Sequence, residues 1–220
     1  MAEQLLIYGN GQMAELSYAR LRRDRRYAVV AFTVDGAVLR ERELCGLPVI
    51  AFEDVERQFP PSSARMFVAV GPLQGNRVRA DRYLQAKKKG YRFVSQVSPR
   101  AVVDPGVQVG ENCSIGDNVV IDPYVRIGDD VWIGTGAVIG HHSSLGDHCF
   151  VGVNCTVLGS VRVGPFALLG AGSVIRDQIS LGQASIVGVG ATIVRDTASD
   201  SVHVAPEAVH LPISSARIRI

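Results

Sequence analysis

Residues 103–198 divide into sixteen consecutive hexapeptides, each of which begins with Val, Ile or Leu. No insertion interrupts this register, and the fifth residue of most hexads is small or β-branched. A six-residue period of this kind predicts a parallel β-helix, in which each unit buries its apolar face only by stacking on its neighbours. Because three hexads complete one triangular coil, residues 18 apart are predicted to stack on one face.

Composition limits the classes of function. The formal net charge of +2 creates no large electrostatic field, so neither nucleic acid nor an anionic membrane is expected as a partner. Hydrophobic residues make up 47% of the chain but aromatic residues only 6%, which fits a repeat core of small aliphatic side chains. The sequence has no apolar run of about 18 residues, and its first residues lack the pattern of a signal peptide. We therefore expect a cytoplasmic protein.

The four cysteines favour packing over chemistry. Cys113, Cys149 and Cys155 occupy the fifth place of their hexads, where a small side chain fills the inside of a coil. Cys45 lies in a predicted loop, and no CxxC spacing occurs. We expect neither a disulfide framework nor a zinc site.

The first 98 residues have a different pattern. Apolar runs at 4–8, 28–34, 47–52 and 66–70 alternate with helical patterns at 13–23, 53–58 and 76–90. This alternation predicts a parallel sheet with helices, over residues 1–98. Residues 99–198 would form the β-helix, and the polar tail 199–220 would cap its open end. The five arginines within 20–26 are predicted to be a solvated helix end.

The hexad register also decides which polar groups meet. His141 is predicted to stack between Pro123 and Gly159, and His142 between Tyr124 and Ser160. His148 lies six residues after His142, on the next side of the triangle, so the two cannot bind one metal ion within a subunit. A β-helical carbonic anhydrase needs three histidines that converge on zinc, and no histidine precedes His141. We predict no metal site.

The two halves together resemble a known family. The stretches that carry the resemblance are IYGNG at 7–11, AFTVD at 31–35, FVAVG at 67–71 and IGHHSSLGDHCF at 139–150. They are similar to sugar acyltransferases of the sialic-acid O-acetyltransferase type, which include N-acetyltransferases of nucleotide-linked amino sugars. The resemblance implies a small Rossmann-like domain followed by a left-handed β-helix. It also implies acetyl-CoA as co-substrate and a homotrimer with active sites between subunits.

The resemblance assigns the acetyl-transfer residues. His141 would be the general base, a role that suits imidazole near neutral pH. Many relatives carry a carboxylate beside this histidine, whereas here His142 follows it and is expected either to orient His141 or to bind substrate. Phe150 aligns with a second family histidine that contacts acetyl-CoA. The pantetheine arm of the cofactor is expected to pass Gly159, Ala171 and Val189, and the Gly159 N–H to bind the thioester oxygen.

The resemblance places the nucleotide at the carboxyl ends of three strands, where open α/β sheets bind ligands. The residues expected to bind the nucleotide-linked sugar are Gly9, Asn10, Gly11, Asp35, Gly71 and Arg77. Backbone N–H groups at 9–11 would receive a phosphate at the start of a helix. Arg77 and Arg79 are candidates for pairing with a pyrophosphate, the alternative being a solvated helix face.

The predicted function is therefore an acetyl-CoA-dependent N-acetyltransferase that acts on a nucleotide-linked amino sugar in bacterial O-antigen or lipopolysaccharide synthesis. Two alternatives stay open. One is an O-acetyltransferase of a sialic-acid-like sugar. The other is a non-catalytic β-helix protein that binds nucleotide sugars, which the missing carboxylate and Phe150 favour.

Overall fold

The computed structural model describes residues 2–208 and 212, and the chain begins with a 6-stranded sheet ordered β3-β4-β2-β1-β5-β6. Its strands are β1 (Glu3–Tyr8), β2 (Tyr27–Val34), β3 (Glu43–Leu44), β4 (Leu47–Ala51), β5 (Ala64–Val68) and β6 (Arg92–Phe93). All neighbours pair in parallel except β3 and β4, which pair antiparallel. The end of β1 is buried on both faces of the sheet, as its continuous apolar run predicts.

Helices cover both faces of this N-terminal sheet. Helix α1 (Gln12–Leu21) packs on one face, and α2 (Val55–Gln58) and α3 (Arg77–Lys88) pack on the other. A short 3₁₀ turn, η1 (Gly36–Val38), follows β2. The predicted alternation of parallel strands and helices is confirmed. No helix in the described part of the chain is long and apolar enough to cross a membrane.

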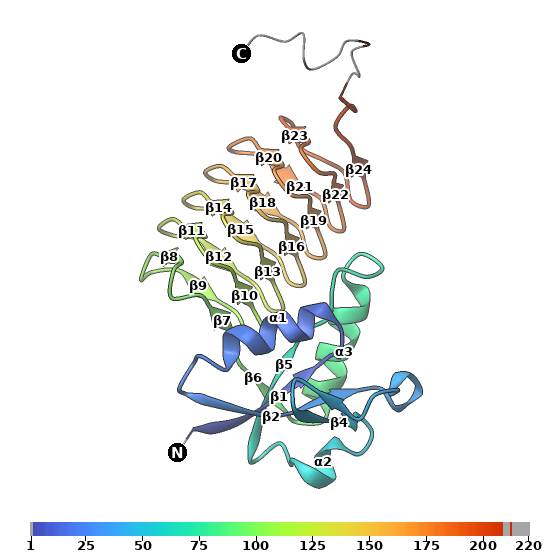
Figure 1. The fold of residues 1–220 in the computed structure, drawn as a ribbon. Coiled ribbons are helices and arrows are strands. Elements are labelled where there is room, and N and C mark those ends of the chain that lie inside the picture. The colour runs from blue at the N-terminus through green and yellow to red at the C-terminus, as the bar shows by residue number, and fades with distance from the viewer. Residues whose placement is uncertain (1, 209–211, 213–220) are drawn as a thin grey trace.

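The second half is a prism of stacked coils with three sheets, which stands on the N-terminal domain (Figure 1). We call its 7-stranded, 6-stranded and 5-stranded faces sheets 1, 2 and 3. Sheet 1 contains β24 (Val202–His203), β22 (Ile186–Val187), β19 (Leu168–Leu169), β16 (Phe150–Val151), β13 (Trp132–Ile133), β10 (Ser114–Ile115) and β7 (Gln96–Val97). Sheet 2 contains β23 (Thr192–Ile193), β20 (Val174–Ile175), β17 (Thr156–Val157), β14 (Val138–Ile139), β11 (Val120–Ile121) and β8 (Val102–Val103). Sheet 3 contains β21 (Ser180–Leu181), β18 (Arg162–Val163), β15 (Ser144–Leu145), β12 (Arg126–Ile127) and β9 (Gln108–Val109).

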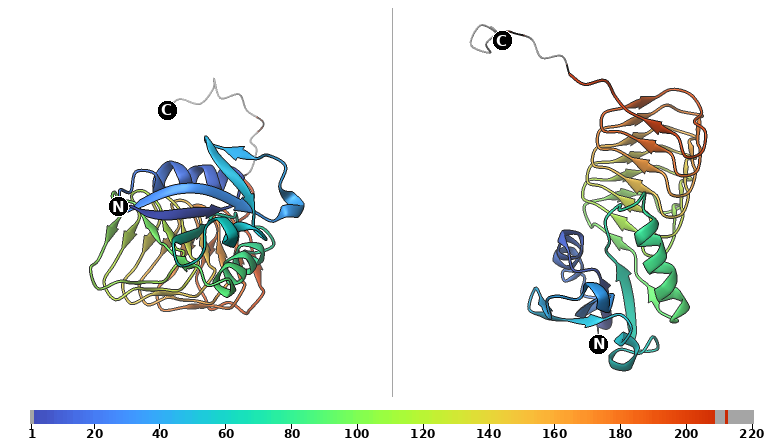
Figure 2. Two further views of the ribbon diagram at one scale, coloured as in Figure 1. Left: turned by 90° about the horizontal axis from the view of Figure 1, so that it is seen from below. Right: turned by 90° about the vertical axis from the view of Figure 1, so that its right-hand side faces the viewer.

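Residues 18 apart pair in parallel through these sheets, which confirms the predicted stacking. Ser114 pairs with Trp132, Val120 with Val138, and Arg126 with Ser144. Figure 2 shows the coils stacked along one axis. Each coil turns at three edges, which we name edge 1–2, edge 2–3 and edge 3–1 after the sheets that they join. Residues 141–142 lie on edge 2–3, residues 171–172 on edge 1–2, and residues 129–130 on edge 3–1.

The inside of the prism holds the hexad residues that were expected there. The second residue of nearly every two-residue strand points inward and is buried, and it packs with the fifth residue of its hexad. Cys113, Cys149 and Cys155 are all buried in this core, as predicted, and Cys45 is exposed. Burial raises the pKa of the Cys113 and Cys149 thiols to about 12 and that of Cys155 to about 11.

The stack extends past both ends of the hexad run. At its start, β7 pairs with β10, so coiling begins at Gln96. At its end, Val202 pairs with Ile186, a separation of 16 residues where earlier coils have 18. The last coil is therefore shorter, and β24 covers the edge of β22. Of the tail predicted as a cap, residues 209–211 and 213–220 lie outside the described residues.

Candidate active site

Two adjacent histidines project from edge 2–3. His141 and His142 form the turn between β14 and β15, and both are exposed. His142 has a positive φ of 59°, which turns its side chain back toward His141. The two Nδ1 atoms lie 3.1 Å apart, so one ring donates its Nδ1–H to the other. The ring of Tyr124, one coil below, lies 4.6 Å from that of His142.

Gly159 provides the space that the His141 ring occupies. A Cβ at Gly159 would lie 2.7 Å from Cε1 and 2.8 Å from Nε2 of His141. The Ser160 N–H donates to the carbonyl of His141 at 2.8 Å, so the coils stack as the register predicts. The Gly159 N–H itself makes no backbone hydrogen bond within residues 2–208 and 212. The imidazole of His141 and the free N–H of Gly159 therefore lie next to each other on edge 2–3.

The residues expected to contact the cofactor lie elsewhere on the prism. Ala171 and Val189 stack on edge 1–2, where the Gly190 N–H donates to the Ala171 carbonyl at 2.9 Å. Phe150 starts β16 on sheet 1 and lies parallel to the Trp132 ring, with centroids 6.3 Å apart. Within one chain, sheet 2 separates edge 1–2 from His141. The structure thus brings together His141, His142 and Gly159. Phe150, Ala171 and Val189 lie away from them within one chain.

The strand ends of the N-terminal sheet converge as predicted. Tyr8 pairs with Thr33 on one side and Val68 on the other, so the turns that follow β1, β2 and β5 share one edge. Gly9 has a φ of 132°, and a Cβ there would lie 2.8 Å from the Ala69 carbonyl oxygen, so only glycine fits. Gly11 precedes α1 and has open space beside it, while Gly71 comes shortly after β5. A glycine turn that leads into a helix in this way can receive a phosphate on its backbone N–H groups.

Asp35 is already engaged at this edge. Its carboxylate accepts a hydrogen bond from the Tyr8 hydroxyl and pairs with Arg82 at 2.6 Å. Burial, and then this hydrogen bond, raise the pKa of Tyr8, so its hydroxyl keeps its proton. Arg77, the first residue of α3, is exposed. Asp35 is thus held in one orientation, whereas Arg77 is free to turn toward a ligand.

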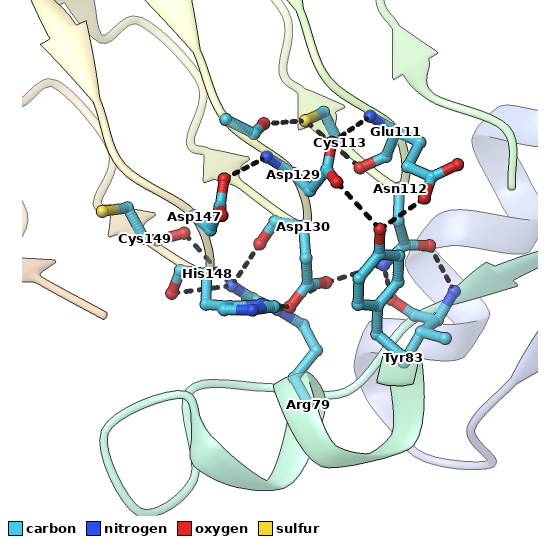
Figure 3. A network of polar contacts seen from close by, with 12 residues as sticks. Arg79, Tyr83, Glu111, Asn112, Cys113, Asp129, Asp130, Asp147, His148 and Cys149 are labelled. Atoms are coloured by element: carbon cyan, nitrogen blue, oxygen red, sulfur yellow. Dashed lines mark hydrogen bonds and ion pairs between the residues drawn. The ribbon is translucent and has the colours of Figure 1, made fainter. Parts of the chain in front are cut away.

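Arg79 corrects one sequence prediction, because it neither faces solvent nor is available to a pyrophosphate. Its side chain is 1% exposed, and its Nε lies 3.1 Å from Oδ1 of Asp130 on edge 3–1 (Figure 3). Its Nη2 donates to the carbonyls of Asp130 and Cys149 at 2.8 and 3.1 Å. Asp130 also accepts from Asn112 at 2.7 Å and lies 2.9 Å from His148 Nδ1. This group fastens α3 to the β-helix, and we call it the domain latch.

A second group of polar contacts continues the latch along α3. The Tyr83 hydroxyl lies 2.5 Å from a carboxylate oxygen of Glu111 and 3.0 Å from one of Asp129, so its single O–H donates to one of the two, and Lys87 pairs with Glu111. Positions 79, 83 and 87 are spaced four apart, so they lie on one face of the helix. The register itself could have revealed part of the latch, because positions 112, 130 and 148 are each 18 apart.

Comparison with known proteins gives the architecture a context. The family model described as the GMPPB C-terminal domain matches residues 95–213, more than half of the chain, which places the chain in that family. A structure of perosamine N-acetyltransferase from Caulobacter crescentus, in complex with CoA and GDP-perosamine, is 30% identical with a TM-score of 0.83. The match covers 93% of this chain and 95% of that one. The chain belongs to the hexapeptide-repeat, left-handed β-helix sugar acetyltransferases.

Two further structures share the fold of this acetyltransferase. The acetyltransferase domain of PglB from Neisseria gonorrhoeae is 23% identical, with a TM-score of 0.84, and the match covers 92% of this chain and 97% of that one. WeeI from Acinetobacter baumannii is 19% identical, with a TM-score of 0.80 and coverage of 91% and 96%. No curated protein matches the sequence. Within residues 2–208 and 212 of the acetyltransferase, no three His, Cys, Asp or Glu side chains are grouped to hold a metal ion.

We expect Gly159→Ala to lower kcat/KM of the acetyltransferase by about 100-fold, because displacement of a reacting group by about 1 Å can cost that much. The new methyl group would displace the His141 ring, while the backbone tolerates alanine since Gly159 has no positive φ. Steady-state kinetics with both substrates would measure the effect. Gly106→Ala, on the same edge two coils below His142, is the matched control. Equal activity of the two variants would contradict the placement of His141.

Proposed function

We propose that the chain transfers the acetyl group of acetyl-CoA to the amino group of a nucleotide-linked sugar, with His141 as general base. The observation that carries this proposal is the pair of Nδ1 atoms 3.1 Å apart at His141 and His142, beneath a glycine that leaves the ring room. The Caulobacter relative, whose structure holds CoA and GDP-perosamine, supports the choice of both substrates.

In the proposed step, the neutral sugar amine attacks the thioester carbonyl, and Nε2 of His141 takes the proton that the nitrogen loses. The C–N bond forms, the C–S bond breaks, and the proton then passes to the sulfur of CoA. His142 acts as a positioning residue, because it accepts the Nδ1–H of His141 and leaves Nε2 free as the base. It would thus do what a carboxylate commonly does for a histidine base.

The backbone has a part in the same step. The free N–H of Gly159 lies beside the imidazole, where it would bind the thioester oxygen as negative charge develops. The nucleotide would bind at the N-terminal sheet through the turn at Gly9, Asn10 and Gly11, with Asp35, Gly71 and Arg77 around it. Phe150, Ala171 and Val189 would line the path of the pantetheine arm. A role in bacterial surface-glycan synthesis stays a prediction.

We infer that a complete site needs more than one chain, because His141 lies on edge 2–3 while Ala171 and Val189 lie on edge 1–2. The outward side chains of the three sheets support this inference. Those of sheet 3 are polar: Gln108, Arg126, Ser144, Arg162 and Ser180. Those of sheet 2 are Val or Thr, and those of sheet 1 above the N-terminal domain are Leu168, Ile186 and Val202. Two apolar faces per chain suit a closed ring, for which we propose a homotrimer.

The trimer has its own test. We expect sedimentation equilibrium to give three times the mass of one chain. Val174→Lys, which places a charge on sheet 2, should dissociate the assembly, and Ser144→Lys on sheet 3 should leave it intact. A monomer in the wild type, or equal behaviour of the two variants, would refute the assignment of the faces.

The acetyltransferase reaction is tested with purified protein, acetyl-CoA and a panel of GDP- and UDP-linked amino sugars, together with their hydroxyl counterparts. Released CoA is followed with a thiol reagent. Cys45 is the exposed cysteine, so the Cys45→Ser protein removes the background. Release only with amino sugars supports N-acetylation, and release only with hydroxyl sugars would replace it by O-acetylation. No release with any sugar would refute the proposal.

A further inference from the structure

A cavity of about 620 Å³ lies between the C-terminal end of α1 and the first coil of the β-helix. Its walls come from residues 20–21 and 23–26 on one side and from residues 96–100 and Asp117 on the other. Helix α1 starts at the carboxyl ends of the strands and runs back to their amino ends, beside β7 (Figure 1). The cavity is therefore at the opposite edge of the N-terminal sheet from the loops at 9–11, Asp35 and Gly71.

The cavity carries an excess of positive charge. Five arginines line it, Arg20, Arg23, Arg25, Arg26 and Arg100, against two aspartates, Asp24 and Asp117, which leaves three positive charges. Arg26 pairs with Asp24 at 2.7 Å, and Arg100 pairs with Asp117. The other three arginines form no ion pair within the part of the chain that the structure describes. Three guanidinium groups are therefore available to an anion.

The β-helix wall of the cavity also interacts with the arginines. Hydrogen bonds from Ser98 and Arg100 hold the pKa of Asp117 below its ordinary value, and the charge of Arg20 lowers it further. Arg20 on α1 is thus close to a carboxylate of edge 1–2. Arginines near a helix C-terminus also offset the helix dipole, but that effect does not explain Arg100, which belongs to the other wall.

A second, independent feature of the cavity is an unsatisfied buried acceptor. Gln96 lines the cavity and is 7% exposed, and its Oε1 is buried without a hydrogen-bond partner among the described residues. Buried carbonyl oxygens are normally paired, so a turn of the Gln96 side chain toward the cavity would let this oxygen accept from a ligand. Val97 and Pro99 beside it present apolar surface. The volume lies within the range of small-molecule sites, which often form between domains.

We propose that this cavity is a second ligand site, which binds a nucleoside diphosphate. Guanidinium groups bind phosphate oxygens through paired N–H groups, which assigns the diphosphate to the arginines. The carboxamide oxygen of Gln96 would accept from a ribose hydroxyl or a base amino group, and Val97 and Pro99 would contact the flat base. A ligand held on both walls would brace α1 against the first coil. The occupant is either the nucleotide of the sugar substrate or a free nucleotide.

Titration calorimetry with GDP, UDP, ADP and inorganic pyrophosphate tests this site in the full chain. We expect Arg23→Glu/Arg25→Glu to weaken binding at the cavity by about tenfold or more, because two attractive charges become repulsive. Asp24→Asn should strengthen it, since it removes one of the two negative charges. The matched control is Arg126→Glu/Arg162→Glu, an equal charge reversal on sheet 3.

These titrations distinguish the two possible occupants, and they distinguish binding in the cavity from binding at the strand ends. Asp35→Ala weakens binding at the strand ends only, so nucleotide binding that survives Asp35→Ala and is lost in Arg23→Glu/Arg25→Glu supports the proposal. Binding confined to GDP or UDP would identify the substrate's own nucleotide as the occupant, and binding of ADP as well would identify a free nucleotide. Equal affinity in the cavity variant and in its control, or pyrophosphate bound as tightly as every nucleotide, would overturn the proposal.

Discussion

Arg79→Met is expected to lower the free energy of unfolding by about 3–5 kcal/mol, the usual effect when one partner of a buried ion pair is removed. The side chains of Arg79 and Asp130 are 1% and 0% exposed, so the buried Asp130 carboxyl would lose its guanidinium partner and keep only its contacts with Asn112 and His148. Methionine fills much of the volume of arginine but cannot donate to the carbonyls of Asp130 and Cys149. The loss is therefore electrostatic and not a cavity effect.

Trp132 provides the measurement. It is the single tryptophan of the chain, and it lies on sheet 1 but packs in the core of the N-terminal domain. Its fluorescence during urea unfolding reports the separation of the two domains, while circular dichroism follows the strands of the β-helix. In Arg79→Met we expect the fluorescence transition to move to lower urea by more than the dichroism transition does.

Two further variants make this result specific. Arg126→Met removes an exposed arginine from sheet 3 and should change stability by no more than about 0.5 kcal/mol. Arg79→Met/Asp130→Asn removes both charges of the pair and should be more stable than the sum of the two single changes predicts. Additive effects would show that the ion pair does not couple α3 to the β-helix.

The domain latch shows which contacts the sequence predicts and which contacts it does not. The hexad register predicted the coils, the buried cysteines and the position of His141 beneath Gly159, because each depends only on a residue's place in the hexad repeat. It also places Asn112, Asp130 and His148 in one column. The register does not reveal what packs against that column, since this depends on the direction of the chain between the N-terminal sheet and β7.

Arg79 and Phe150 illustrate that difference. An arginine in a helix rich in Arg and Lys has the pattern of a solvated face, and only the docking of α3 on edge 3–1 buries it. Phe150 stands at an outward position of sheet 1, where the family resemblance implies a cofactor contact. The structure adds a contact that the resemblance does not give, because Phe150 lies against Trp132, which packs in the core of the N-terminal domain. Contacts between domains, and between chains, leave no period in the sequence.

His141→Gln is expected to lower kcat by about 10²–10⁴-fold, the usual contribution of a general base. Glutamine approximates the size of the ring and keeps polar atoms at its end, but it cannot take the proton from the amine. The KM values for both substrates should change little, since the proposed contacts to nucleotide and pantetheine come from other residues. Steady-state kinetics with the nucleotide amino sugar that the substrate panel identifies would measure kcat and KM separately.

His203→Gln, on the last strand of sheet 1, is the control and should leave kcat unchanged. His142→Gln tests the positioning role, because glutamine can accept the Nδ1–H of His141 through its carbonyl oxygen and should lose much less activity than His141→Gln. The reverse order, with activity kept in His141→Gln and lost in His142→Gln, would make His142 the base. Since the two Nδ1 atoms lie 3.1 Å apart, either ring can orient the other, and only this comparison decides which Nε2 receives the proton.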